Sequence, residues 1–473
     1  MRTGLFYLLP MRDARLLIAP RGPESGSATI ASHAIADSYL SAAAERLAFV
    51  QQCEGGEVSG LENLNFFTEN SLVDDPYDYY DAIRRCPVRR EPVHGVVMVS
   101  GYDEAVAVQR DTDQSFSVCN IVSGPWSGIP IDTDSDDISD LIEQHRHRVT
   151  FGDYFIAFDP PKHTAHRSLL SRLFTPRQLK NNEDFLWRLA DEQLNRFIAQ
   201  RNCEIVVDYN FPFTLDAITD LLGVPEADRE RFRRAARASR LEGERSGFVG
   251  VKEEWFVDYI EDRRRNPRED VLTELALATF PDGTTPKVID VARVATFMYA
   301  AGHGTTIDLL SLAMLMLAER PDLQQQLRED NSKIPAFIEE MLRFESPIKS
   351  NFRMARRTTR IGDIDVGAGT SVLVMNGAAN RDPRRFEEPD EFRLDRPNIL
   401  QHIAFGRGIH TCPGAPIARA EVRVSLERIL DRMADIRLSE AEHGRPGARR
   451  LTWDRTFLFR RLKELHLEFT PVQ

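Results

Sequence analysis

The sequence of 473 residues has few cysteines, and no two of them stand in a C-x-x-C spacing. The five cysteines lie far apart in the chain, at Cys53, Cys86, Cys119, Cys203 and Cys412. An odd number at these spacings suggests neither a disulfide framework nor a zinc ribbon. We therefore expect a reducing, cytoplasmic location, and each cysteine has to be interpreted by itself.

Basic residues are fewer than acidic ones. The chain has 61 Lys and Arg residues against 73 Asp and Glu residues, a net charge of -12. Such a balance gives no general electrostatic support for binding nucleic acid. Hydrophobic residues make up 42% and charged residues 28%, which is ordinary for a globular protein and excludes collagen-like and disordered classes. We expect a monomer that binds a small molecule.

An uninterrupted hydrophobic run of membrane-spanning length is missing as well. The apolar residues 4–11 are followed directly by charged ones, which makes a poor signal peptide or span. Residues 294–318 approach the required length, but His303 and Asp308 stand near their middle. Because charge inside a bilayer is costly, this segment is predicted to be a buried helix, and no membrane contact is expected.

The pattern from residue 70 onward is mainly helical. Amphipathic periodicity and helix start signals predict helices over residues 76–85, 163–173, 183–200, 227–239, 253–265, 271–279, 286–320 and 415–433. Short β-branched clusters predict strands over residues 97–100, 360–366 and 371–375. The expected fold is mainly α, a single large helical domain over residues 70–473 with a minor β-sheet region. Residues 1–69 are expected to be an N-terminal extension, whose role the sequence does not indicate.

Cys412 differs from the other cysteines by its surroundings. It lies in the glycine-rich segment F-G-R-G-I-H-T-C-P-G, residues 405–414, which opens the predicted helix 415–433. A helix N-terminus favours the thiolate and lowers the pKa of the thiol, which prepares the sulfur as a soft metal ligand. Glycines at 406, 408 and 414 allow sharp turns and a close approach to a flat macrocycle. The other cysteines are expected to be small buried apolar side chains.

This segment resembles the heme-thiolate signature of the cytochrome P450 superfamily, and further motifs follow in the order of that family. Glu340 and Arg343 match its E-x-x-R element, in which the two side chains share a helix face. Residues 379–396 resemble the family's meander, where Arg396 is expected to complete a structural triad with that pair. Residues 159–176 match a further signature. The resemblance extends from about residue 75 to residue 469 and so covers most of the chain.

The resemblance implies heme b (iron protoporphyrin IX) as cofactor, with Cys412 as the ligand of its iron. The expected cofactor contacts are His163, Arg167, Ala301, Gly302, Arg353, Phe405, Gly406, His410, Cys412 and Gly414. Of these, His163, Arg167, Arg353 and His410 correspond to groups that hold the heme propionates through charge-assisted hydrogen bonds.

A thiolate bound to heme iron favours cleavage of the oxygen–oxygen bond. The resemblance therefore implies a monooxygenase that inserts one atom of dioxygen into a small apolar substrate. The chain has no convincing G-x-G-x-x-G on a predicted strand and no iron–sulfur cysteine spacing, so a separate ferredoxin or flavodoxin with its reductase is expected to deliver the electrons. Because ferredoxins are acidic, a basic patch is expected around Arg407 and Arg419.

Residues 301–306, A-G-H-G-T-T, resemble the family's oxygen-activation groove, in which Thr305 matches the catalytic threonine. Two glycines inside a helix cost about 1 kcal/mol each relative to alanine, so either close approach of heme and dioxygen or tight helix packing should require them. Most members carry an acid directly before this threonine, whereas this chain has Gly304. His303, Asp308 or a chain of waters could replace that acid.

Gly304 leaves other functions open. A peroxide-using or rearranging heme-thiolate enzyme does not depend on the missing acid, and a heme-binding sensor or carrier would have no turnover. The substrate pocket is expected to draw on residues 121–126, residues near Phe248, and residues 299–302, 348–352 and 457–459, which are largely apolar and aromatic. Lys349, Ser350 and Asn351 could orient a polar end of the substrate. A terpenoid, a fatty acid, an aromatic or a polyketide-like molecule would each fit.

Overall fold

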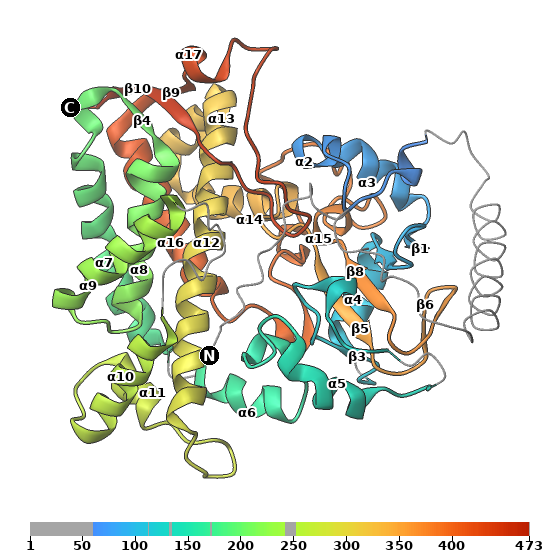
Figure 1. Cartoon of the computed structure of the whole chain (residues 1–473). Helices are drawn as coiled ribbons and strands as arrows, with labels where there is room; N and C mark the ends of the chain where they lie inside the picture. The colour runs from blue at the N-terminus through green and yellow to red at the C-terminus, as the bar shows by residue number, and fades with distance from the viewer. Residues whose placement is uncertain (1–59, 112, 132–134, 171–172, 242–251, 473) are drawn as a thin grey trace, which may run out of the picture.

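The computed structural model describes residues 60–111, 113–131, 135–170, 173–241 and 252–472, and the account below concerns these (Figure 1). Most of the expected N-terminal extension and the expected pocket residues near Phe248 lie outside them. Phe66 and Phe67 are both 3% exposed and stack against Tyr79 and Phe352, so the packed part of the chain includes residues that precede position 70.

Helices form most of the described structure, as predicted. They are α2 (Ser71–Asp74), α3 (Tyr77–Arg84), α4 (Tyr102–Arg110), α5 (Ser139–His145), α6 (Lys162–Leu169), α7 (Pro176–Asn195), α8 (Phe211–Leu221), α9 (Glu226–Leu241), α10 (Glu253–Arg265), α11 (Val271–Ala276), α12 (Val288–Glu319), α13 (Pro321–Glu329), α14 (Ile334–Phe344), α15 (Asn376–Ala379), α16 (Ala415–Arg432) and α17 (Glu440–His443).

The strands are short and form a minor part of the fold. They are β1 (Val88–Arg90), β2 (Val97–Val99), β3 (Phe116–Ser117), β4 (Asn202–Glu204), β5 (Asn351–Ala355), β6 (Thr359–Ile361), β7 (Ile364–Val366), β8 (Ser371–Val374), β9 (Met433–Leu438) and β10 (His466–Pro471). One sheet has the order β1-β2-β8-β5-β3, in which only β2 and β8 are parallel; β4-β10-β9 form a second sheet, and β6 pairs with β7.

The long helix α12 lies at the centre of the fold. It packs against α8, α10 and α16, and these helices fill one side of the molecule, while the larger sheet lies on the other side (Figure 1). By length and composition α12 could cross a membrane, but 72% of its most apolar window is buried inside the protein. Its burial confirms the prediction of a core helix and explains its apolar composition.

Several features of the described chain differ from the sequence-based predictions, which included neither α4 and α5 nor the strands β3, β4, β5, β9 and β10. Helix α8 was not predicted, because almost all of its residues are buried and it therefore lacks the one-sided apolar pattern of a surface helix. Cys86 is disulfide-bonded, whereas Cys119, Cys203 and Cys412 are free. The interpretation of Cys86 as an isolated apolar side chain is therefore wrong.

Candidate active site

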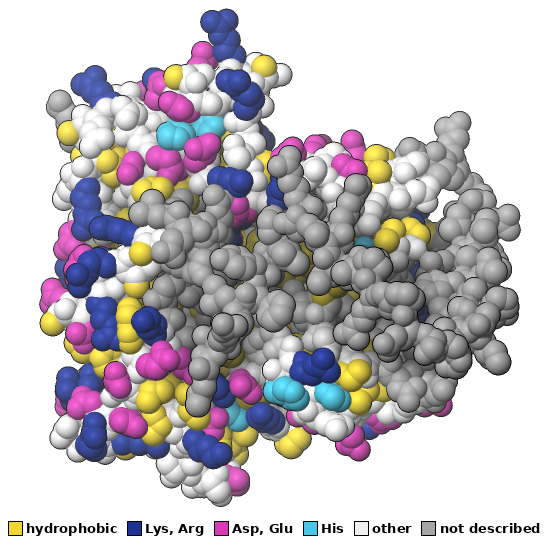
Figure 2. Space-filling model, in the orientation of Figure 1, with side chains coloured by type: hydrophobic (Ala, Val, Ile, Leu, Met, Phe, Trp, Pro, Cys, Tyr) yellow, Lys and Arg dark blue, Asp and Glu magenta, His cyan; other side chains and the backbone are white. Residues whose placement is uncertain are grey.

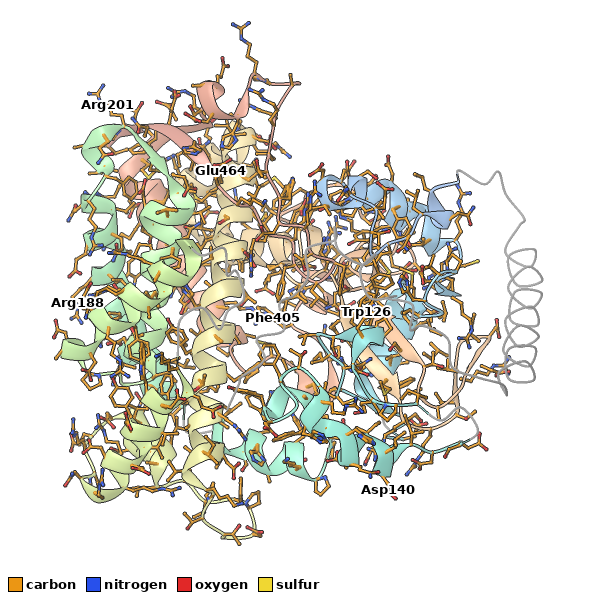
Figure 3. All side chains as sticks on the ribbon, in the orientation of Figure 1. Trp126, Asp140, Arg188, Arg201, Phe405 and Glu464 are labelled. Carbon is orange, nitrogen blue, oxygen red and sulfur yellow. The ribbon has the colours of Figure 1, made fainter. Side chains whose placement is uncertain are left out.

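The loop that carries Cys412 turns sharply before α16. Gly406 and Gly408 have φ of 70° and 75°, in the left-handed region that favours glycine. The Cys412 amide then donates a hydrogen bond of 2.8 Å to the Phe405 carbonyl, which closes the loop. Phe405 packs against the core that includes α12 (Figure 3), and the Arg419 guanidinium lies 4.7 Å from the centre of its ring. The loop thus holds Cys412 just before the first turn of α16.

Gly408 makes the sharp turn that was predicted, but its contact is with protein and not with a ligand. A Cβ on Gly408 would lie 2.5 Å from the Gln109 carbonyl oxygen of α4, so this glycine allows the loop to pack against α4 rather than against a ligand. Gly414 has φ of -81°, and its nearest heavy atom is the Cys412 sulfur, 3.9 Å from an added Cβ. Of these two glycines, only Gly414 bears directly on the space at the sulfur.

The Cys412 thiol is not activated by its helix alone. Burial raises the pKa of this thiol, while the amides of Gly414 and Ala415 and the charges of Arg167 and Arg419 lower it by less, so that it stays above its ordinary value. The prediction of a lowered thiol pKa from the helix N-terminus is therefore wrong for the protein without a metal. A bound metal ion would supply the missing stabilisation, since it deprotonates a coordinating thiol outright.

Four basic side chains gather beside this loop, and none of them forms an ion pair with an acid in the described part of the chain. His163 and Arg167 come from α6, Arg353 comes from β5, and His410 precedes Cys412 by two residues. The rings of His163 and His410 are 4.0 Å apart, and Arg167 hydrogen-bonds to the Thr411 carbonyl. Among the described residues neither ring nitrogen of His163 has a hydrogen-bond partner, although the side chain is 2% exposed.

The electrostatics of this basic cluster favour an anion. Burial, together with neighbouring positive groups, lowers the pKa of His163 to about 4 and that of His410 to about 2, while burial lowers the pKa of Arg353 to about 10. Among the residues that the structure describes, Arg353 donates to the Asn351 amide oxygen and the Phe352 carbonyl alone, each at 2.7 Å. A ligand that carries carboxylates would restore the charge balance and give the nitrogens of His163 acceptors.

The middle of α12 has a partly exposed stripe within an otherwise mostly buried helix. Ala301, Gly302, Gly304 and Thr305 are half-buried, whereas Tyr299 and Thr306 are buried. The Thr305 hydroxyl donates a 2.8 Å hydrogen bond to the Ala301 carbonyl, as expected for a threonine that can open the helix locally. Partial exposure at the centre of a core helix marks an accessible space along this stretch.

Gly302 is explained by helix packing. A Cβ at this position would lie 2.9 Å from the Ile218 Cδ1 atom of α8, so the glycine lets α8 approach α12 closely. Of the two explanations offered by the sequence, tight helix packing therefore accounts for Gly302. Tyr299 is fully buried, and its ring packs against Phe232 of α9 and Phe256 of α10. The assignment of Tyr299 to a substrate pocket is wrong.

Neither side chain expected to replace the acid at Gly304 is available as a simple substitute. Asp308 forms an ion pair with Arg461 through hydrogen bonds of 2.8 and 2.9 Å, and it is 1% exposed. The His303 Nδ1 atom lies 2.9 Å from the Thr214 hydroxyl of α8. Both residues are thus engaged with neighbouring segments.

The expected structural triad is present. The Glu340 carboxylate accepts hydrogen bonds of 2.7 and 2.8 Å from Arg343, and the Arg396 Nε atom lies 3.2 Å from both carboxylate oxygens. Glu340 and Arg343 are fully buried and Arg396 is 4% exposed. The triad ties α14 to the loop that leads to the Cys412 segment.

The surface outside the site carries mixed charge. On the face drawn in Figure 2, Lys and Arg side chains alternate with Asp and Glu side chains over the helical part. Near the Cys412 loop, Arg419 pairs with Glu339 at 2.5 Å, and Arg407 donates to the Gln401 carbonyl at 2.7 Å. Leu400 and Ile409 beside them are 70% and 52% exposed. The basic groups predicted for this surface are thus accompanied by exposed apolar ones.

The sequence analysis did not identify the buried acid Glu421. Glu421 of α16 is 2% exposed, and burial raises the pKa of its carboxyl to about 8. The signal for it was present in the chain, because Glu421 falls on the buried face of the helix, three residues after Ala418 and four before the buried Ser425.

These features define a helical protein with a cysteine-centred site for an anionic cofactor, and comparisons with known proteins identify its class. Residues 251–434 match the family model described as Cytochrome P450. The chain is 30% identical over 397 residues to Cytochrome P450 107B1 of Saccharopolyspora erythraea, covering 83% of this chain and 96% of that protein.

Solved structures of cytochromes P450 also match this chain. Cytochrome P450 CYP150A6 of Mycobacterium marinum, in its substrate-free form, is 52% identical with a TM-score of 0.83, and the match covers 87% of this chain and 100% of that one. CYP109E1 of Bacillus megaterium in complex with testosterone is 27% identical with a TM-score of 0.69, covering 83% and 99%. The chain belongs to the cytochrome P450 superfamily. It is a heme-thiolate monooxygenase whose cofactor is heme b.

The described residues fit heme b. The half-buried Cys412 sulfur offers a soft ligand for iron. The unpartnered nitrogens of His163 and the Arg353 guanidinium, which hydrogen-bonds to no carboxylate among the described residues, suit propionates. No group of three or more His, Cys, Asp or Glu residues that could hold a second metal occurs in the described part of the chain.

Proposed function

We propose that this monooxygenase inserts one oxygen atom of dioxygen into a small apolar molecule and receives its electrons from a separate ferredoxin or flavodoxin with its reductase. The single observation that carries the site assignment is the acid-free cluster of His163, Arg167, Arg353 and His410 beside Cys412. Its charge and its unpartnered nitrogens call for an anionic cofactor next to a thiol.

In this proposal Cys412 is the iron ligand and the four basic residues bind the propionates. We propose that Phe405, Gly406 and Gly414 contact the cofactor on the side of the sulfur, and that Ala301 and Gly302 contact it on the opposite side. When bound, heme supplies the reductive activation of dioxygen. The chain's own contribution is to fix the sulfur through the loop, to neutralise the propionates, and to exclude bulk water with α12 and its neighbours.

Thr305 is proposed to hold a water molecule that donates protons at the oxygen-binding side. Its hydroxyl now donates to the Ala301 carbonyl, and this bond weakens the regular helix hydrogen-bonding there. A hydroxyl that can turn from that carbonyl towards a water molecule can hold the water in place. Thr305→Ala is expected to reduce product formation more than NADH consumption, and an equal loss of both would contradict this role.

An apolar substrate is supported by an aromatic cluster on the side of the larger sheet. Phe67, Trp126, Phe352 and Phe457 form five ring pairs whose centres lie 5.4 to 6.1 Å apart, and Trp126 is 52% exposed (Figure 3). Aromatic walls of this kind favour hydrocarbon ligands. The complex of CYP109E1 with testosterone supports the same substrate class.

The redox partner is tested at the surface of the Cys412 loop. Arg407→Glu should lower ferredoxin-driven turnover and its salt dependence, because a positive group facing an acidic partner is reversed. Arg445→Glu serves as a matched control, since Arg445 is 87% exposed and lies on a different segment. Equal turnover and equal salt dependence in both variants would reject this docking surface.

The heme-thiolate premise has its own experiment. The reduced protein under carbon monoxide should give a strongly red-shifted Soret band, and Cys412→Ser should lose this band while it keeps the fold by circular dichroism. The band's absence from the wild type would reject the assignment of Cys412. Formation of product from hydrogen peroxide alone, at the rate of the complete electron chain, would instead favour the peroxide-using alternative that Gly304 raises.

We also propose a cytoplasmic monomer, with residues 70–473 as the heme domain. The buried α12 supports a protein without a membrane span. The disulfide at Cys86 is compatible with this location only if it forms after the cell is opened, because such bonds are rare in the cytosol. Thiol labelling of the protein as it exists in the cell would decide the location, since a labelled Cys86 requires reducing surroundings.

A further inference from the structure

Lys349 is a buried amine to which no acid is bound. It lies between α14 and β5, and the residue is 5% exposed. Among the described residues its ammonium group forms neither an ion pair nor a hydrogen bond. Burial, together with repulsion from Arg460, lowers its pKa to about 7, and the attraction of Glu345 opposes this only in part. Lysine is rarely buried unless it is paired, so this amine calls for an anionic partner.

The hydroxyl of Tyr80 is a second buried polar group without a partner. Tyr80 of α3 is 1% exposed, and its hydroxyl oxygen has no hydrogen-bond partner in the described part of the chain. Gly377 of α15, which packs against α3 (Figure 1), connects it to Lys349. The Gly377 amide donates a 2.9 Å hydrogen bond to the Lys349 carbonyl, and a Cβ on Gly377 would lie 3.4 Å from the Tyr80 hydroxyl oxygen. We call Lys349 and Tyr80 the polar niche.

The titratable groups around the polar niche are already engaged. Arg460 and Glu345 influence the pKa of both niche residues, and they pair with each other at 3.2 Å. Arg381 acts on the niche hydroxyl and pairs with another acid at 3.0 Å. Burial raises the pKa of Tyr77 and Tyr79 on α3, so both stay neutral. Within the described chain none of these groups offers the niche amine a free carboxylate.

The polar niche adjoins the aromatic cluster that supports an apolar substrate. Tyr80 belongs to the same buried core as Phe67 and Phe352, and Phe457 packs against that core. The Lys349 amide donates a 2.8 Å hydrogen bond to the carbonyl of the residue that follows Phe457. Phe457 itself is half-buried, so apolar surface next to the niche is accessible to a ligand.

An unpaired ammonium group beside an aromatic wall fits a ligand that is anionic at one end and apolar elsewhere. We propose that the substrate is an amphipathic carboxylic acid, whose carboxylate accepts hydrogen bonds from Lys349 and Tyr80 while its hydrocarbon part lies against the aromatic cluster. Burial raises the pKa of Tyr80, so its hydroxyl keeps the proton that it donates. The proposal rests on the proposed function and narrows the class of its substrate.

The test uses the heme-loaded full chain and three variants, Lys349→Met, Lys349→Arg and Tyr80→Phe. Lys333→Met is the matched control, because Lys333 pairs with Asp330 at 3.9 Å and its side chain is 44% exposed. Equilibrium dialysis measures the dissociation constants of decanoate and decanol, which have the same hydrocarbon chain and differ at one end. This readout needs neither electrons nor turnover.

The variants should separate the two ends of the ligand. Lys349→Met should weaken decanoate binding about 10- to 100-fold, the range expected for a hydrogen bond to a charged group, and leave decanol binding unchanged. Tyr80→Phe removes one neutral donor and should weaken decanoate binding about three- to tenfold. Lys333→Met should bind both ligands as the wild type does.

The dependence on pH provides a second signature. The free protein loses the charge of Lys349 as the pH rises through about 7, so decanoate affinity should be highest below that pH and fall above it, by about tenfold for each further unit. Decanol affinity should not change over this range. Lys349→Arg keeps its charge and should prefer decanoate to decanol without the fall above pH 7.

Three results would overturn the proposal. The first is equal weakening of decanoate and decanol binding, or of neither, in Lys349→Met. The second is a decanoate affinity of the wild type that does not change with pH. The third is an acetate affinity equal to that of decanoate, which would make the polar niche a site for small anions. If Lys349→Met fails to fold, Tyr80→Phe and the wild-type pH profile decide. Failure of the proposed function would be seen separately, as a wild type without the red-shifted Soret band.

Discussion

Replacement of Glu340 by glutamine tests how the fold is held together around the heme site. The carboxylate lies between two buried guanidinium groups, with contacts of 2.7 and 2.8 Å to Arg343 and 3.2 Å to Arg396, and it also accepts a 3.0 Å hydrogen bond from the Arg393 amide. Glu340→Gln keeps the shape of the side chain but leaves both guanidinium charges without an anion.

The magnitude follows from burial. Removing one partner of a buried ion pair costs about 3–5 kcal/mol, since the remaining charge has lost its compensation. Total stabilities of domains are about 5–15 kcal/mol, so this loss is a large fraction of the free energy of unfolding. We expect a large fall in the denaturant midpoint, with heme loss accompanying unfolding, since the triad ties α14 to the segment before Cys412.

The assay is urea unfolding of the heme-loaded protein, followed by tryptophan fluorescence and by the Soret band. Glu388→Gln is the control: Glu388 pairs with Arg393 at 3.1 Å, but its side chain is 57% exposed, and such surface pairs contribute about 0–1 kcal/mol. Equal unfolding midpoints for Glu340→Gln and Glu388→Gln would refute the reasoning that the buried triad stabilises the domain.

Three further predictions concern single residues. Arg353→Met should accelerate heme loss about tenfold without lowering the stability of the apoprotein, as measured by transfer of heme to an acceptor protein, because Arg353 has no carboxylate partner among the described residues. Gly408→Ala should reduce heme content and destabilise the protein by about 1–3 kcal/mol in thermal unfolding, because φ is 75° and the new Cβ meets the Gln109 carbonyl. Burial raises the pKa of Glu339, but hydrogen bonds from Arg419 and His402 lower it to about 2. The ionised carboxylate therefore stabilises the fold fully above pH 4.5, and this stabilisation is lost as the pH falls towards 2. The difference in unfolding free energy between wild type and Glu339→Gln should shrink over that range.

Local patterns in the chain were sufficient for much of the fold. Helices α3, α6, α10, α12 and α16 follow from amphipathic periodicity, a proline start or a long apolar segment, and each appears within a few residues of its predicted limits. The E-x-x-R spacing likewise predicts the pairing of Glu340 with Arg343, because three residues are close to one turn of a helix. Such inferences need only neighbours in sequence.

The wrong or missing predictions concern features that depend on packing between segments distant in the sequence. Helix α8 is buried on nearly all sides, so its apolar residues have no periodic pattern to detect. The same holds for α12, where an apolar sequence all round does not reveal that Tyr299 faces α9 and α10. The pKa of the Cys412 thiol had the opposite direction from the prediction, because its burial depends on the whole fold and outweighs the local effect of the helix N-terminus.

The arrangement of buried charge separates the groups that stabilise the fold from those that bind or react. Glu340, Glu339 and Asp308 each have a positive partner, so their charges are compensated within the protein. His163 and Arg353 lack an acid and Glu421 lacks a base, and each of these two imbalances costs free energy in the protein alone. A folded protein retains such uncompensated buried groups where a bound ligand or a proton compensates their charge. For the basic cluster this is an anionic cofactor, and for Glu421 it is the proton that burial keeps on its carboxyl.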